Sequence, residues 1–169
     1  MDFQEIILKL DRYWARQGCA LLPPGAARPR PSARLCLAGA ARREPAQDGL
    51  EGLYRYRVFL SPAPAGARRA FLESLRAAGI DRSEHDLRWL PFDAPDGPDA
   101  AAGWNVLLDG QALASFLYKV SGAGSAQASA EIFVSLERLA LASQRRRSAG
   151  ELTWAGRLTY GELHAGEGE

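Results

Sequence analysis

Two apolar segments on either side of an Asp-Gly pair place the tightest limit on how this chain can fold. Residues 104–120 read WNVLLDGQALASFLYKV, and Asp109-Gly110 separates two stretches rich in aliphatic and aromatic residues. An Asp-Gly pair in this setting is typical of a two-residue hairpin turn, because both central residues of such a turn adopt a positive φ. We therefore predict two adjacent antiparallel strands, and with them an antiparallel sheet.

The N-terminal third predicts a helix followed by a second hairpin. Asp2 and Glu5 form a capping pair, and apolar residues continue at helical spacing up to a stop at Gly18. Residues 34–38 and 53–60 are strand candidates, and the polar, turn-rich residues between them predict a long-looped antiparallel hairpin. The proline-rich residues 23–33 predict a loop, because proline removes backbone donors and restricts the residue before it.

The remaining segments complete an α+β pattern. We predict a helix over residues 64–79, a strand over 86–91, a loop over 92–103 and a helix over 126–144. The order helix, hairpin, helix, strand, hairpin, helix makes an antiparallel sheet flanked by helices.

The composition fits one soluble globular domain, residues 1–169. The chain has 47% hydrophobic and 24% charged residues, whereas a disordered chain has fewer apolar residues and a larger charge imbalance. This length suits a single core and is short for two ordinary domains. The formal net charge of +1 indicates no overall attraction to nucleic acid or to an anionic membrane.

The cysteines and histidines give no sign of a metal site or a catalytic triad. Cys19 and Cys36 lack metal-ligand spacing and no secretory leader precedes them, so reduced thiols in a cytoplasmic protein are expected. No apolar run approaches the roughly 18 residues of a membrane span. His85 and His164 are predicted to be surface residues, and the four tryptophans core or interface aromatics rather than base-stacking platforms.

Segments in a fixed order along the chain carry a resemblance to a known family. These segments are residues 129–141, SAEIFVSLERLAL, and residues 3–22, 53–64, 71–89, 103–110 and 157–164. The first of these, interpreted as an amphipathic helix, resembles the third signature motif of class II aminoacyl-tRNA synthetases. The series as a whole resembles the α subunit of the bacterial two-subunit glycyl-tRNA synthetase, whose pattern at that motif is approximately SAEITYGLERIAM. The resemblance implies the class II synthetase core, which is also α+β.

The resemblance implies ATP and Mg²⁺ as cofactors and assigns candidate residues to them. Arg138 stands where the family's motif 3 arginine contacts the ATP phosphates, and a planar guanidinium suits that task. Arg42 and Arg43 match the two arginines of a motif 2 pattern resembling VEPSRRP, while its glutamate falls on Gly39. Glu131 is the candidate carboxylate for ATP and metal. The alternatives are an arginine in a structural ion pair for Arg138 and a helix-entry carboxylate for Glu131.

The candidate amino-acid pocket departs from the family pattern. Where the family resembles GWEVWLDGMEITQFTYFQQ, this chain reads GWNVLLDGQALASFLYKVS. Asn105 and Ala112 replace two glutamates, and Ser115 replaces a glutamine. A glycine ammonium needs anionic or carbonyl acceptors, which these residues supply poorly. Asp109 survives as an acidic group, with a turn aspartate as the alternative.

Other departures concern partners. The motif 2 loop, residues 44–52, is shorter than the family's DGRYGENPNR-like segment, and residues 23–33 replace a stretch resembling GAGTMNPATF. The chain ends near His164, where the family continues into a helical region that helps engage the large β subunit. A homodimer is implied by the resemblance. Tight coupling to a larger synthetase-like subunit, and contact with tRNA, are left open.

The sequence is therefore consistent with three functions. One is a glycyl-tRNA synthetase α-like framework with impaired or lost glycine–tRNA ligase activity. Another is a non-catalytic accessory paralogue that binds a partner protein or small ligand, including a purely structural dimer. The last is an adenylating enzyme with a non-tRNA acceptor. Catalysis requires that Arg42, Arg138 and Glu131 converge on ATP, so side chains on separate faces would count against it.

Overall fold

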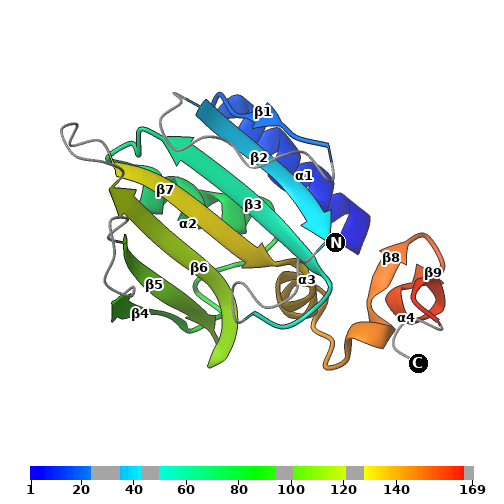
Figure 1. Cartoon of the computed structure of the whole chain (residues 1–169). Coiled ribbons are helices and arrows are strands. Elements are labelled where there is room, and N and C mark those ends of the chain that lie inside the picture. The colour runs from blue at the N-terminus through cyan, green and yellow to red at the C-terminus, as the bar shows by residue number, and fades with distance from the viewer. Residues whose placement is uncertain (24–34, 43–49, 94–100, 121–127, 166–169) are drawn as a thin grey trace.

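The computed structural model describes residues 1–23, 35–42, 50–93, 101–120 and 128–165, and their main feature is a seven-stranded sheet (Figure 1). Its strand order is β1-β2-β3-β7-β6-β5-β4. The strands are β1 Ala20–Leu21, β2 Leu35–Arg42, β3 Tyr54–Ser61, β4 Leu87–Asp93, β5 Ala101–Leu108, β6 Gln111–Val120 and β7 Ala128–Ser135. Neighbouring strands are antiparallel except for the parallel pair β1–β2.

Helices cover one side of this sheet, which confirms the α+β prediction. The helices are α1 Phe3–Arg16, α2 Ala67–Ala77 and α3 Leu136–Gln144. The sheet side that faces the viewer in Figure 1 carries none of these helices, and we call it the open face. After α3 come η1 Ala149–Glu151, β8 Thr153–Ala155, β9 Leu158–Thr159 and α4 Tyr160–Leu163. None of the helices in the described part of the chain is long and apolar enough to cross a membrane.

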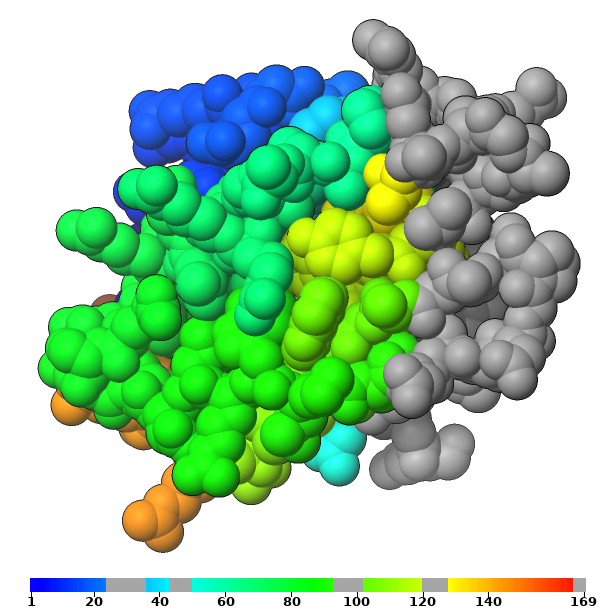
Figure 2. All heavy atoms as spheres, turned by 90° about the vertical axis from the view of Figure 1, so that its left-hand side faces the viewer, coloured from blue at the N-terminus to red at the C-terminus, as the bar shows by residue number. Residues whose placement is uncertain are grey.

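Helix α1 begins and packs as the sequence predicts. The Asp2 side chain accepts a hydrogen bond from the Glu5 backbone N–H at 2.7 Å and so caps the first turn. The helix buries an apolar stripe against the sheet, consisting of Phe3, Ile6, Leu10 and Trp14. In the space-filling view of Figure 2, α1 (blue) and the blue-green α2 lie on the same flank of the molecule.

The hairpin of β5 and β6 is confirmed. Asp109 and Gly110 both have positive φ, 50° and 80°, as a two-residue turn of this kind requires. A register shift between Val106 and Leu107 marks an irregularity in the ladder. Trp89 and Trp104, beside this hairpin, pack against the core as predicted. The Cζ atom of Arg68 on α2 lies 4.4 Å from the centre of the Trp89 ring and 4.9 Å from that of Trp104.

The helix predicted over residues 126–144 is wrong in its first half. Ala128–Ser135 is the central strand β7, and helix α3 begins only at Leu136. Alternate residues of β7, including Ile132 and Val134, are buried on the helix-covered side, so the real period is two. The Ser135 hydroxyl accepts from the Arg138 backbone N–H at 3.2 Å and caps α3, which fixes the switch from strand to helix.

Strand β2 is longer than predicted and ends at Arg42, so this arginine lies on a strand and not in the loop predicted between strands 34–38 and 53–60. The extension follows from its full pairing with β3, in which Arg42 faces Tyr54. The predicted loop 23–33 lies outside the described residues apart from Pro23, and so does the motif 2 loop 44–52 apart from residues 50–52.

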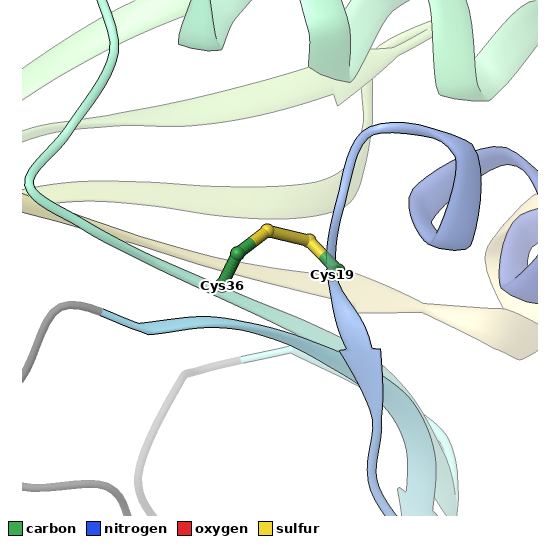
Figure 3. Close-up of a disulfide and its surroundings, with 2 residues drawn as sticks. All are labelled: Cys19 and Cys36. Carbon is green, nitrogen blue, oxygen red and sulfur yellow. A yellow bond between two sulfur atoms is a disulfide. The ribbon is translucent and has the colours of Figure 1, made fainter.

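The prediction of reduced cysteines is wrong, because Cys19 and Cys36 form a disulfide (Figure 3). Parallel pairing of β1 with β2 sets Ala20 opposite Leu37 and so brings the preceding cysteines together, with their Cα atoms 4.4 Å apart. The cysteines are 17 positions apart in sequence, and nothing in their local sequence predicts this strand pairing.

Candidate functional site

The open face has two cross-strand rows of side chains over its central strands. Because alternate residues of a strand share a face, the register aligns them across β5, β6, β7 and β3. The first row is Asn105, Ser115, Phe133 and Arg57, and the second is Gly103, Leu117, Glu131 and Phe59. Together with Lys119 of β6 we call these residues the central face.

Glu131 lies between two cations on the central face. Its Oε1 is 3.7 Å from Nη2 of Arg57 on β3, and its Oε2 is 3.2 Å from Nζ of Lys119 on β6. The Glu131 side chain is only 12% exposed, against 29% for Arg57 and 42% for Lys119. Both carboxylate oxygens are therefore engaged, and the helix-entry role considered for Glu131 is wrong, because the residue is in mid-strand.

Apolar groups surround this charged cluster. The Arg57 guanidinium lies 5.5 Å from the centre of the Phe133 ring. A Cβ atom on Gly103 would approach Cζ of Phe92 and the Phe116 carbonyl oxygen at 2.7 Å each, so only glycine fits beneath the Phe92 ring. The central face thus combines a polar centre with aromatic and aliphatic walls.

Two of the four predicted pocket residues come together and two do not. Asn105 and Ser115 are cross-strand neighbours, and the Ser115 hydroxyl donates to Asn105 Oδ1 at 3.4 Å. Ala112 is exposed beside the hairpin turn, opposite Leu107. Asp109 is in the turn itself, at the opposite end of β6 from Lys119.

Asp109 fastens the turn to the segment that precedes β4. Its Oδ2 lies 2.6 Å from His85 Nδ1, and its Oδ1 accepts from the Asp86 backbone N–H at 2.8 Å. These two hydrogen bonds, that of His85 foremost, lower the pKa of Asp109. The arrangement is that of a turn aspartate.

Replacing Asp109 with asparagine should make the stability of the protein less sensitive to acid. A carboxyl group whose pKa is lowered in the folded state stabilises the fold at pH values above the ordinary Asp pKa of about 3.9. This stabilisation is lost as the pH falls through the pKa of the folded state. Asn-Gly forms the same turn, so D109N should unfold with a shallower acid-side decline than the wild type in urea titrations between about pH 6 and 3. An unchanged slope, matching that of the exposed Glu151→Gln control, would contradict this assignment.

Arg138 is in the first turn of α3 and faces Glu51, with Nη2 3.8 Å from Oε2. Other groups hold Glu51 through its backbone, since its carbonyl oxygen accepts from the Ser135 hydroxyl at 3.0 Å and from Arg55 Nη1 at 2.9 Å. The Glu51 side chain is 91% exposed. Arg138 therefore lies at the edge of the open face, at the end of β7. The backbone of Glu51 is fixed, but its side chain, which pairs with Arg138, is exposed to solvent.

The three candidate ATP residues do not converge. Arg42 lies over the Tyr54 ring, 5.9 Å from its centre, and Tyr54 packs against Phe3 of α1 on the helix-covered side. Glu131 is on the opposite side, in the central face. The strand runs roughly 13 Å from Glu131 to its end at Ser135, at about 3.3 Å per residue, and Arg138 follows in the first turn of α3. Arg43 lies outside the described residues.

A buried network behind the site was missed by sequence reasoning. Glu137 is 4% exposed, and its Oε1 accepts from the Leu53 and Tyr54 backbone N–H groups at 2.8 and 2.9 Å and from the Tyr160 hydroxyl at 3.0 Å. His164 Nε2 lies 2.7 Å from the Tyr54 hydroxyl, and its Nδ1 lies 2.7 Å from the Tyr160 carbonyl oxygen. His164 is thus buried, contrary to the surface position predicted for it.

The signals for these two residues differ. Glu137 stands beside Arg138 in the motif 3 pattern, so its place in the motif was a usable hint. For His164 no sequence signal exists, because its partners come from β3 and α4. We call these contacts the Glu137 network.

The described residues offer no cluster that would hold Mg²⁺ through protein side chains alone. They contain no group of three or more His, Cys, Asp or Glu side chains placed to bind a metal. Mg²⁺ prefers carboxylate and phosphate oxygens, whereas both oxygens of Glu131 face cations. The assignment of Glu131 as a metal ligand therefore has no geometric support.

Comparisons with known proteins agree with this architecture. The family model described as glycyl-tRNA synthetase alpha subunit matches residues 26–169. A structure of PylSc, a pyrrolysyl-tRNA synthetase of Desulfitobacterium hafniense, is similar with a TM-score of 0.57 and 14% identity over 93% of this chain and 74% of that one. A crystal structure of pyrrolysyl-tRNA synthetase from the same organism has a TM-score of 0.57 and 13% identity over 94% and 75%. At these identities the structural likeness concerns the fold.

Proposed function

Because the chain belongs to the glycyl-tRNA synthetase alpha subunit family and shares its fold with class II synthetases, we propose that it is a ligand-binding relative of that subunit with impaired or lost glycine–tRNA ligase activity. The observation that carries the proposal is the engagement of Glu131 by Arg57 and Lys119. A carboxylate held in this way is a poor acceptor for a substrate ammonium and a poor ligand for Mg²⁺.

The position of Arg42 supports the same conclusion. Activation of an amino acid requires groups that surround the α-phosphate and hold both reactants in line. Arg42 packs on Tyr54, on the side of the sheet opposite Glu131. The two residues do not act on one bound ATP without a rearrangement of the sheet edge.

An adenylating enzyme with a non-tRNA acceptor is the second candidate, and Arg138 favours it. Its only ion pair among the described residues joins it to the exposed Glu51 at 3.8 Å. Exposed pairs of this kind contribute at most about 1 kcal/mol, so a phosphate group would displace Glu51 readily. We therefore propose Arg138 as the residue that contacts the phosphates of a bound nucleotide.

The family also guides the expected context. We propose that residues 1–169 act as one catalytic-core-like domain that forms a homodimer, as the family resemblance described above implies. A larger synthetase-like subunit is a candidate partner, because the family is the alpha subunit of a two-subunit enzyme. A cytoplasmic location follows from a role near protein synthesis.

Calorimetric titration with ATP·Mg²⁺, with and without glycine, tests the proposal alongside pyrophosphate exchange. We expect ATP to bind, and Arg138→Gln to weaken binding about tenfold to a hundredfold, because a charge-assisted hydrogen bond contributes roughly 1.5–3 kcal/mol. Glycine should change neither the heat nor the exchange. Arg146→Gln, which removes an exposed arginine after the same helix, is the matched control.

The outcomes separate the candidates. Glycine-dependent exchange would contradict lost activity and establish an authentic small synthetase. No ATP binding by the wild type would contradict a nucleotide-binding framework and leave the accessory role without ATP.

A further inference from the structure

The central face carries an excess of positive charge that is built into the sheet. Arg57 comes from β3 and Lys119 from β6, the two strands that flank β7, so the register holds them at diagonal positions on either side of Glu131. Two cations thus share one carboxylate, which leaves a net charge of +1.

Solvent reaches the cations more than it reaches the carboxylate. Glu131 is largely covered at 12% exposure, while Arg57 and Lys119 are 29% and 42% exposed. A guanidinium and an ammonium each carry more N–H donors than one ion pair uses. The cluster therefore presents donors outward and keeps its single carboxylate inward, as an oxyanion site does.

An ammonium group finds no free acceptor in this cluster. Glu131 is the only carboxylate of the central face as defined above, and both its oxygens face cations. An ammonium that approached it would become a third positive charge beside two others, which is unfavourable in a partly covered site. Glycine has a single carboxylate beside its ammonium and no second acid group, so it gains little here.

The neighbours of the cluster suit a short carbon chain. Leu117 and Phe59 flank Glu131 within the second row, and the Phe133 ring packs under Arg57. An aliphatic linker would therefore lie on apolar surface while its terminal carboxylate meets Arg57 and Lys119.

From this geometry we infer that the central face binds a small dicarboxylate, as a plain diacid or an acidic amino acid, with one carboxylate on Arg57 and Lys119. The inference rests on the proposed function only in treating the chain as a ligand-binding relative of the alpha subunit, and it names a ligand class for the open face.

The chain offers a selective probe, because it contains only two lysines, Lys9 and Lys119. Reductive methylation with ¹³C-formaldehyde keeps the positive charge and places an NMR label on both lysines and on the N-terminus. Lys9 is exposed on α1 and serves as the internal reference. Variants Lys119→Met and Lys9→Met assign the two signals.

Titration with succinate, L-aspartate, L-glutamate, glycine and sodium sulfate then tests the inference without ATP. We expect the Lys119 signal to shift saturably with at least one diacid or acidic amino acid, while the Lys9 signal stays in place. Succinate alone would identify a plain diacid, and L-aspartate or L-glutamate alone an acidic amino acid. Calorimetry on unlabelled protein should show binding that Arg57→Gln or Lys119→Met weakens about tenfold or more, with Lys9→Met unchanged.

Three results would overturn the inference. They are a response to glycine at the same concentrations, an equal response to sulfate, or no response of Lys119 to any diacid. Thermal unfolding of each variant checks that it is folded. Since none of these measurements uses ATP, their failure is distinct from a failure of ATP binding in the proposed function.

Discussion

Replacing Glu137 with alanine should lower the free energy of unfolding by about 3 kcal/mol, because the change leaves buried hydrogen-bond donors without an acceptor. Those donors are the backbone N–H groups of Leu53 and Tyr54 and the hydroxyl of Tyr160. Glu137→Gln keeps the shape and one carbonyl acceptor, so its loss should be smaller. Urea denaturation with matched m-values measures both.

The control for this experiment is Glu151→Ala, which removes an exposed glutamate and should change stability by no more than about 0.5 kcal/mol. A Glu137→Ala variant as stable as this control would show that the network contributes nothing. The substitution should also disturb the surroundings of Arg138, because Gly52 packs directly against the Glu137 carboxylate. Glu137 thus anchors residues 51–54, from which Glu51 reaches Arg138.

Local sequence signals predicted the elements that local interactions decide. The Asp109-Gly110 turn and the Asp2 cap depend on residues within a few positions of each other, and both are present. Strand β7 was misjudged because Ile132, Leu136 and Leu139 also fit a helical spacing, and burial between β3 and β6 is what selects the strand. The resemblance to motif 3, interpreted as one helix, does not correct this error.

The candidate site was less predictable, because its chemistry depends on which strands are neighbours. The sequence identifies Glu131 as a candidate acidic group for ATP and metal. In the sheet its carboxylate is already paired with Arg57 and Lys119, so it is a poor acceptor for either. Likewise Arg42 matched a motif arginine, and strand register decides that it packs on Tyr54. A residue type and its spacing identify a candidate, whereas the sheet order determines what the candidate faces.

Reduction of the Cys19–Cys36 disulfide should lower the free energy of unfolding by about 3 kcal/mol. A crosslink that closes a loop of about 15 residues reduces the conformational entropy of the unfolded chain, and this is the size of that effect. We expect dithiothreitol to lower the melting temperature of the wild type and Cys36→Ser to reproduce the loss. A Cys19→Ser/Cys36→Ser double variant, the matched control, should not respond to dithiothreitol. Alkylation of two thiols in unreduced, denatured protein would contradict the disulfide. A reducing compartment would remove this crosslink, so the chain would then hold β1 against β2 through backbone pairing alone.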